Sequence, residues 1–344
     1  MQLSNRDLQI LDTVIRSYIL TGDPVGSKTL KEIHSLNMSP ATIRSSMSRL
    51  CEAGLLCQPH TSAGRLPTPL GYRYFIQQLI SRCVLDENAR RLIDDVFTEL
   101  NEDTEHLLDN ACEILADITG CVALMTTPYD SSAGVKKITL VPVDKYTAVL
   151  MIVTSAGMIK SRICRFEKQI KPDFLAKIDN MLTSALVDVP LDNVTPASVQ
   201  SMLASFGDDS LYAMPAVFTA LQMIESLSHA SIKLKGQSNL FLHREFSADR
   251  MKPLFDWLQN EPQISNMLSQ AGGDVTVILG SETGEQALGN SGVIVAKYRL
   301  GDSNAGAIGI LGPDRMNYES IIPSVIYFRE SLSRYLTNRF SERF

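Results

Sequence analysis

The chain has 344 residues, which predicts more than one folded core, and its 44% apolar and 20% charged residues are typical of a globular protein. No apolar run reaches the roughly 20 residues that cross a bilayer, and the first twelve residues lack the basic and then apolar stretch of a signal peptide. Six scattered cysteines without a CxxC pair argue against a disulfide framework or a zinc site. We therefore expect a cytoplasmic protein that neither crosses a membrane nor binds a metal.

Charge is distributed unevenly along the chain. The net charge is −6, but residues 1–80 carry eight basic and five acidic side chains, so this segment is +3 and the remainder is −9. Between residues 33 and 85 the only acid is Glu52, against five arginines. A small positive module on an acidic body is what local binding to phosphate groups requires. A solvated surface of mixed charge is the alternative.

Three helices are predicted at the start of the chain. Ser4 and Asp7 can form a capping box in front of a helical apolar pattern. Ser27 can cap a short second helix. Ser39, followed by proline, marks the start of a third helix that runs to about residue 53, with Gly54 at its end. Two short helices joined by a tight turn form a helix-turn-helix.

The third helix separates into two faces on a helical wheel. Ile43, Met47 and Leu50 point inward, toward the first two helices. The opposite face is short, polar and basic, and small side chains let a helix enter the major groove of DNA. The candidate DNA contacts from this helix and its cap are Ser39, Ala41, Thr42, Arg44, Ser45, Ser48 and Arg49. An ordinary solvent-facing helix surface is the alternative.

A strand, a loop and a second strand follow the third helix. Residues 55–58 and 66–68 are predicted strands that flank the acid-free loop 59–65, and the next helix is predicted over 71–80. Strands in this position would make a wing that contacts the DNA backbone or the minor groove. The candidate contacts in the loop are His60, Thr61 and Arg65. For His60, a plain loop histidine is the alternative.

Three segments carry a family resemblance: residues 18–27, residues 39–44, and residues 58–68 together with the Gly71-Tyr72-Arg73 that follows. They resemble the heat-inducible transcription repressor HrcA family, and the long wing segment makes chance agreement improbable. One departure is Ser45, where the family usually has Asn. Because the wheel places Ser45 at the centre of the outward face, base preference at one operator position stays open.

The second half of the predicted architecture mixes helices and strands. Residues 86–120 and 172–186 are predicted helices, as is the last one, 318–336, and the predicted strands are 122–125, 138–143, 149–153, 158–166, 275–279, 292–300 and 305–311. Helices that cover one face of an antiparallel sheet make an α+β domain, which is similar to the GAF-like domain of the family. Between residues 189 and 272 helices dominate, with one short strand predicted at 239–242. In the family, this position holds an inserted domain that helps dimerisation.

The predicted fold class is therefore α+β and multidomain. Residues 1–82 form a winged helix-turn-helix, residues 86–188 and 273–344 form the two parts of a GAF-like domain, and residues 189–272 form the inserted, mostly helical dimerisation domain.

No motif for catalysis or for a cofactor was found. The sequence lacks GxxxxGK[ST], HExxH and GxSxG, so we expect a protein without a cofactor that is not an enzyme. The resemblance implies a homodimeric repressor that binds the CIRCE inverted repeat upstream of chaperone operons. It also implies that the GroEL chaperonin assists the repressor and that heat inactivates it. The alternatives are a repressor whose GAF-like domain senses a metabolite, and an enzyme with a vestigial DNA-binding module.

Overall fold

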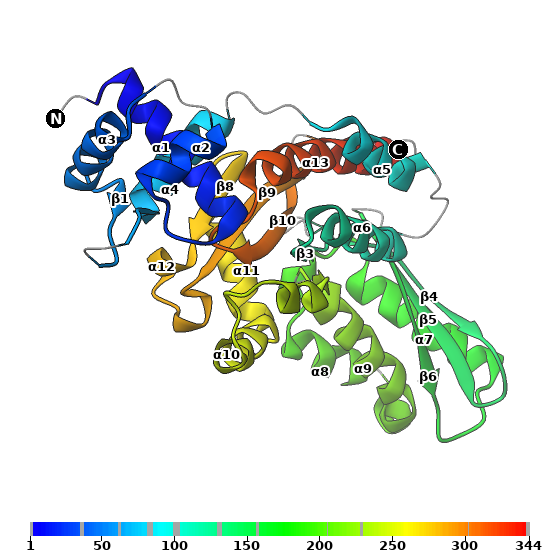
Figure 1. Ribbon diagram of the computed structural model, residues 1–344. Coiled ribbons are helices and arrows are strands. Elements are labelled where there is room, and N and C mark those ends of the chain that lie inside the picture. The colour runs from blue at the N-terminus through cyan, green and yellow to red at the C-terminus, as the bar shows by residue number, and fades with distance from the viewer. Residues whose placement is uncertain are drawn as a thin grey trace.

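The computed structural model describes residues 3–34, 38–60, 63–80, 85–98, 104–128, 133–155, 158–204, 206–227, 230–301 and 303–341. It shows a mixed α+β chain built around two antiparallel sheets and a small hairpin (Figure 1). The larger sheet contains, in spatial order, β7 (Ile232–Lys235), β3 (Val122–Thr126), β10 (Ser303–Pro313), β9 (Ser291–Leu300) and β8 (Val275–Leu279). The smaller sheet contains β4 (Val135–Pro142), β5 (Thr147–Thr154) and β6 (Ile159–Arg165).

The N-terminal elements occur in the predicted order. They are α1 (Asn5–Thr21), α2 (Ser27–His34), α3 (Pro40–Glu52), β1 (Leu56–Cys57), β2 (Leu66–Pro67) and α4 (Pro69–Ile80). The capping box of α1 is confirmed, because the Ser4 hydroxyl accepts from the Asp7 backbone and the Asp7 carboxylate accepts from the Ser4 backbone. Gly54 follows α3 with a φ of +73°, a conformation that favours glycine. Ser27 is the first residue of α2 and not its cap, since Leu30 N donates to the carbonyl of Gly26.

Helices cover both faces of the five-stranded sheet, so the prediction that they cover one face was wrong. On one face lie α4, α6 (Thr104–Thr119) and α13 (Tyr318–Ser341), with α5 (Glu87–Thr98) packed on α13. On the other face lie α10 (Ala248–Leu258) and α11 (Glu261–Gln270). The reason appears in β9, where residues 293–296 are all buried and show no alternation. Strands buried on both faces are apolar at every position.

The three-stranded sheet has a core of its own. It packs with α7 (Pro172–Leu186), α8 (Pro196–Ala204) and α9 (Ser210–Leu227), and residues 133–227 supply this core. Within the segment 189–272 that was predicted as an insertion, β7, α10 and α11 pack with the five-stranded sheet and not with the core of residues 133–227. The strand predicted at 239–242 is also wrong: the segment is a 3-10 helix, η3 (Gln237–Leu242). The remaining short helices are η1 (Leu191–Asn193), η2 (Gly207–Asp209), α12 (Gly280–Thr283) and η4 (Gln286–Leu288).

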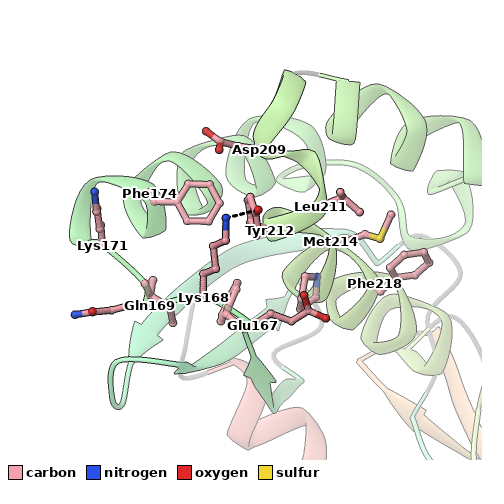
Figure 2. Close-up of a pocket in the computed structure, with 13 residues that line it drawn as sticks. Glu167, Lys168, Gln169, Lys171, Phe174, Asp209, Leu211, Tyr212, Met214 and Phe218 are labelled. Atoms are coloured by element: carbon pink, nitrogen blue, oxygen red, sulfur yellow. Dashed lines mark hydrogen bonds between the residues drawn. The ribbon is translucent and has the colours of Figure 1, made fainter.

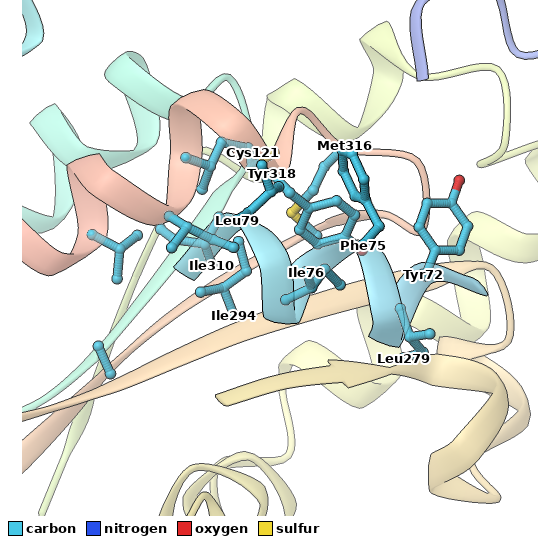
Figure 3. Packing of buried hydrophobic residues seen from close by; sticks show 14 of the residues in the cluster. Tyr72, Phe75, Ile76, Leu79, Cys121, Leu279, Ile294, Ile310, Met316 and Tyr318 are labelled. Carbon is cyan, nitrogen blue, oxygen red and sulfur yellow. The ribbon is translucent and has the colours of Figure 1, made fainter. Parts of the chain in front are cut away.

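The N-terminal helices share a core with the sheet. Buried apolar residues of α1, α3 and α4 belong to the same cluster as those of β9, β10 and α13. Figure 3 shows Tyr72, Phe75 and Leu79 of α4 lying over the strands that carry Ile294 and Ile310. The described parts of α1, α3 and α4 are thus continuous in packing with the five-stranded sheet, while the separate domain over residues 1–82 stays a prediction. In Figure 1 the three-stranded sheet projects from the opposite end of the molecule from α3.

Candidate nucleic-acid interface

The helix α3 begins at a fully formed N-cap. The Ser39 hydroxyl accepts a hydrogen bond from the backbone N–H of Thr42 at 3.1 Å, and Pro40 lies in the first turn. The hydroxyls of Ser39 and Thr42 lie 2.9 Å apart, so they also share a hydrogen bond. Both side chains keep access to solvent. A polar, accessible first turn at the positive end of the helix dipole suits contact with an anion.

The buried and exposed faces of α3 are those that the helical wheel predicted. Ile43, Met47 and Leu50 are at most 3% exposed, and they pack in the core shared with α1. The exposed positions are Ala41, Arg44, Ser45 and Ser48. These side chains are short apart from the arginine, so a groove could approach the helix backbone closely. Their contact with DNA stays a prediction.

Arg44 is an exposed cation on this face. Among the described residues its guanidinium has no hydrogen-bond or ion-pair partner, while its backbone carbonyl accepts from the Ser48 hydroxyl at 3.1 Å. Within the described parts of α3 and the hairpin, the one acidic residue is Glu52, at the far end of the helix. The Arg44 charge is therefore available to an anion from outside the chain.

Arg49 has a structural role that the sequence pattern did not indicate. Its Nη2 donates to Asp7 Oδ1 at 2.5 Å, and the Asp7 side chain is 3% exposed. The hydrogen bond from Arg49 holds the pKa of Asp7 well below its usual range, although burial acts in the opposite direction. Arg49 Nη1 also donates to the Ser45 hydroxyl at 3.1 Å. The guanidinium therefore fastens α3 to the start of α1, and contact of Arg49 with DNA stays a prediction.

The hairpin of β1 and β2 is tied to the loop that precedes α2. Val25 N donates to Arg65 O at 3.0 Å, and Arg65 N donates to Val25 O at 2.9 Å. Gly64 lies against the same loop, where an added Cβ would stand 2.5 Å from the carbonyl carbon of Val25. No real Cβ tolerates that distance, so the close approach requires glycine. The loop before α2 and the hairpin segment therefore form one structural unit.

Two of the three predicted contacts of the hairpin loop, His60 and Arg65, lie in different environments. His60 is exposed, and its carbonyl accepts from Ala63 N at 2.9 Å. Arg65 is half-buried: its Nε is buried without a hydrogen-bond partner, and its Nη1 lies 3.4 Å from Ala63 O. A guanidinium with unused donors can still hydrogen-bond to an oxygen that approaches from outside. Thr61 lies outside the described residues.

The prediction did not include the contacts that join the N-terminal helices to the rest of the molecule, hereafter the body. Arg73 on α4 makes two hydrogen bonds, of 2.7 Å and 2.6 Å, to the carboxylate of Glu282. Arg315 Nη1 donates to Ile19 O, near the end of α1, at 3.0 Å. The partners lie 209 and 296 residues apart in the chain. No local pattern indicates such pairs, because capping and periodicity act over one helical turn.

A separate pocket lies on the unit formed by residues 133–227. Its volume is about 680 Å³, it is open to solvent, and Phe174 and Phe218 are among its apolar lining residues. Figure 2 shows Lys168 reaching toward Tyr212, to whose hydroxyl its ammonium donates, with the Nζ 3.9 Å from the ring centroid. Charged side chains of both signs line the pocket, namely Glu167, Lys168, Lys171 and Asp209. The lining therefore does not select a ligand by the sign of its charge.

The described residues show neither a candidate metal cluster nor a membrane-spanning helix. In that part of the chain, no group of three or more His, Cys, Asp or Glu side chains could hold a metal ion. No helix there is both long enough and apolar enough to cross a membrane.

Comparisons with known proteins place the chain in one family. The family model for the HrcA protein C-terminal domain matches residues 105–322. A curated relative from Brevibacillus brevis, named heat-inducible transcription repressor HrcA, is 30% identical over 99% of this chain and 100% of its own length. A relative of the same name from Syntrophobacter fumaroxidans is 31% identical over 97% of both chains.

A solved structure shares the fold. A crystal structure described only as that of a hypothetical protein aligns with a TM-score of 0.73 at 24% identity, over 98% of this chain and 99% of that one. The family match covers most of the body, while the relatives also span the N-terminal helices. The chain therefore belongs to the HrcA family.

Proposed function

We propose that the protein is a transcription repressor that binds duplex DNA through α3 and the hairpin of β1 and β2. The observation that carries this proposal is the outward face of α3. Its side chains are exposed, and they are short apart from that of Arg44, a cation without a partner among the described residues. In this proposal α2 and α3 serve as a helix-turn-helix and α3 enters the major groove. The names of the curated relatives, which are transcription repressors, support the same function.

The hairpin serves as the wing. Its link to Val25 fixes it beside the loop that leads into α2, and so beside the helix-turn-helix. Arg65 then donates to a phosphate or sugar oxygen from the accessible end of its guanidinium, because its Nε is buried. His60 and Thr61 extend this contact along the DNA backbone, while Thr42, Arg44 and Ser45 of α3 contact base edges.

The protein acts as a homodimer through the outer face of the three-stranded sheet. Val141, Val149 and Ile163 lie next to one another in register across β4, β5 and β6. Val141 is 47% exposed and Ile163 is 63% exposed, and Ile159, beside Val153, is 58% exposed. A contiguous exposed apolar face favours association with a partner. A two-fold dimer then reads an inverted repeat, because its two DNA-binding surfaces are related by the same symmetry.

We propose the target and the regulation from the resemblance to the HrcA family. The operator is the CIRCE inverted repeat upstream of chaperone operons, and the bound cytoplasmic repressor blocks initiation without catalysing a reaction. The GroEL chaperonin keeps the repressor active, and heat diverts GroEL to unfolded proteins. Such a switch requires a shift of only a few kcal/mol between active and inactive populations.

The deciding experiment is a gel-shift titration of the full chain. One duplex carries the CIRCE repeat and the other carries the same bases in scrambled order, each with and without GroEL at fixed salt concentration. Preferential binding to the repeat supports the proposal. Equal affinity for both duplexes would show a general DNA-binding protein and contradict it.

Arg44→Ala tests the groove contact directly. We expect operator binding to weaken by about 1–3 kcal/mol, with relaxed base selectivity at one position, because a hydrogen bond to a base edge is lost. Lys252→Ala, which removes an exposed cation on α10, is the matched control and should leave binding unchanged. If Arg44→Ala binds the operator as tightly as the unaltered chain, Arg44 does not contact the bases.

The pocket beside Tyr212 favours a second candidate, a repressor that responds to a small molecule. Its volume of about 680 Å³ suits a metabolite or a cofactor fragment. Isothermal titration with candidate metabolites, in the presence and absence of the operator duplex, separates the two functions. Binding that changes operator affinity would favour the ligand-responsive repressor.

A further inference from the structure

We propose that Arg244 and Arg315 are positioning residues for DNA binding, because they clamp the C-terminal end of α1 to the body and so set the direction in which α3 faces. The inference rests on the proposed function, since it concerns how the α3 surfaces of a dimer meet two half-sites. Neither arginine lies near α3 itself; both act through α1.

The end of α1 has carbonyl groups that its own helix cannot satisfy. The last four carbonyls of any α-helix lack intrahelical partners, and α1 has no basic residue in its last turn. Arg315 Nη1 donates to Ile19 O at 3.0 Å, and Arg244 Nη2 donates to Thr21 O. The two arginines thus supply the missing donors and the positive charge that a helix C-terminus attracts.

The body holds Arg315 firmly. Arg315 forms an ion pair with Glu245 in which the two side chains are 15% and 16% exposed. Burial raises the pKa of Glu245, but the hydrogen bond and the charge of Arg315, a backbone hydrogen bond and the charge of His243 together lower that pKa by more, so the pair stays ionised. Arg315 lies in the turn between β10 and α13, where Asp314 N donates to Asn290 O at 3.0 Å. The clamp therefore starts from a fixed point at the end of β10, the central strand of the five-stranded sheet.

Gly22 makes room for the two guanidinium groups. Its φ is +71°, and an added Cβ would lie 3.0 Å from Arg244 Nη2 and 3.1 Å from Arg315 Nε. A side chain here would be disfavoured by the backbone conformation and would crowd both arginines. Gly22, which ends α1, is thus also the residue against which the guanidinium groups of Arg244 and Arg315 pack.

The apolar contact of α4 does not by itself fix the orientation of the N-terminal helices. Tyr72, Phe75 and Leu79 pack along one side of α4. Apolar packing is non-directional, so it resists separation more than it resists rolling about the helix axis. The hydrogen bonds at the end of α1 are directional and lie on a different helix. Together with the hydrogen bonds from Arg73 on α4 to Glu282 and the ion pair of Arg16 on α1 with Glu319, they limit rotation of the N-terminal helices.

The helix α1 carries this orientation to α3. Its far end is joined to α3 by the hydrogen bonds between Asp7 and Arg49. A helix of 17 residues is about 25 Å long, so a tilt of about 10° moves its far end by about 4 Å, roughly one base-pair step. A dimer that reads two half-sites at a fixed spacing cannot absorb such a shift at both sites.

The test measures how affinity depends on the spacing of the half-sites. Arg315→Gln, Arg244→Gln and the double variant are compared, as full-length chains, with the unaltered chain. Arg329→Gln is the matched control, because Arg329 is also 15% exposed and pairs with Asp274 within the body. Each protein is titrated with a single arm of the CIRCE repeat and with complete repeats whose spacer is changed stepwise by up to about 5 base pairs, half a helical turn.

We expect the double variant to bind the native repeat at least tenfold more weakly and the single arm within twofold, with a flattened dependence on spacer length. The single Arg244→Gln variant, which alters an exposed side chain, should change the profile in the same direction. An unchanged spacer profile, an equal loss on the single arm, or a gain in affinity would overturn the inference. Failure of the unaltered chain to prefer the CIRCE repeat would overturn the proposed function as well.

Discussion

At the residue scale, two arginines of one helix have different tasks. Arg44 faces outward without a partner among the described residues, whereas Arg49 hydrogen-bonds to Asp7, Ser45 and Ser46. Both are predicted DNA contacts on the wheel, which orders side chains by angle and not by what they touch. The difference arises because the capping carboxylate of α1 lies within reach of one arginine.

Asp7→Ala tests the structural task of that pair. We expect a loss of about 2 kcal/mol in the free energy of unfolding at pH 7, because the change removes a cap and charge-assisted hydrogen bonds. The lowered pKa of Asp7 gives the direction of the pH dependence. This stabilisation is complete above the unfolded pKa, about 4, and is lost as pH falls below it. Urea unfolding of both chains from pH 7 to pH 3 measures the difference.

Asp12→Ala is the matched control for this experiment. Asp12 lies on the same helix and pairs with Arg16, but its side chain is 45% exposed. An exposed pair of this kind contributes less than about 1 kcal/mol. If Asp7→Ala and Asp12→Ala unfold alike across the pH range, the contact between Asp7 and Arg49 has no special part in holding α3.

At the element scale, the hairpin and the loop before α2 behave as one unit. Their link consists of the two backbone hydrogen bonds between Val25 and Arg65, and Gly64 allows the backbones to meet. Gly71 plays a comparable part on α4, where an added Cβ would lie 2.2 Å from the carbonyl oxygen of Leu55. Gly64 and Gly71, which both belong to the segments that resemble the family, are thus required where two backbone segments approach closely.

Gly64→Ala should separate the hairpin from the loop. We expect a loss of about 1–3 kcal/mol in stability, because the new methyl group must displace backbone atoms, together with faster amide exchange at Val25 and Arg65. Gly26→Ala is the control in the same loop, since its Cβ would meet only the Thr29 hydroxyl, at 3.5 Å. Equal amide exchange in the Gly64→Ala chain and the unaltered chain would contradict this account of the hairpin.

At the scale of the whole molecule, the surface proposed for dimerisation is far from the surface proposed for DNA. The three-stranded sheet projects at one end of the chain and α3 lies at the other (Figure 1). The five-stranded sheet and its helices connect the two ends through a core shared with α4. Association and DNA contact can therefore be altered separately by substitution.

Ile163→Asp tests the dimer surface. The change places a charge in the centre of the exposed apolar face, so we expect the dimer dissociation constant to rise at least tenfold, because a buried unpaired carboxylate is unfavourable. Analytical ultracentrifugation measures it. Leu242→Asp, at a position 78% exposed on another part of the molecule, is the control. A chain that remains dimeric with Asp at position 163 would exclude this face as the interface.

The sequence by itself determined the features that depend on neighbours within about one helical turn. The cap of α3 at Ser39, the capping box of α1 and the inward face of Ile43, Met47 and Leu50 were all predicted, as were the strands at 149–153 and 158–166, which pair in the structure. Capping and periodicity are local interactions, so a short window of residues contains them. The exposed face of α3 followed from the same periodicity.

Only the tertiary structure decided which segments meet. The strands at 135–165 form one sheet, whereas the strand at 232–235, inside the segment predicted as an insertion, joins the other sheet. The clamp of Arg315 on the end of α1 and the bond between Arg49 and Asp7 were missed for the same reason. Partners distant in the chain are selected by packing and hydrogen bonding after the elements form, and nothing in either segment alone records that choice.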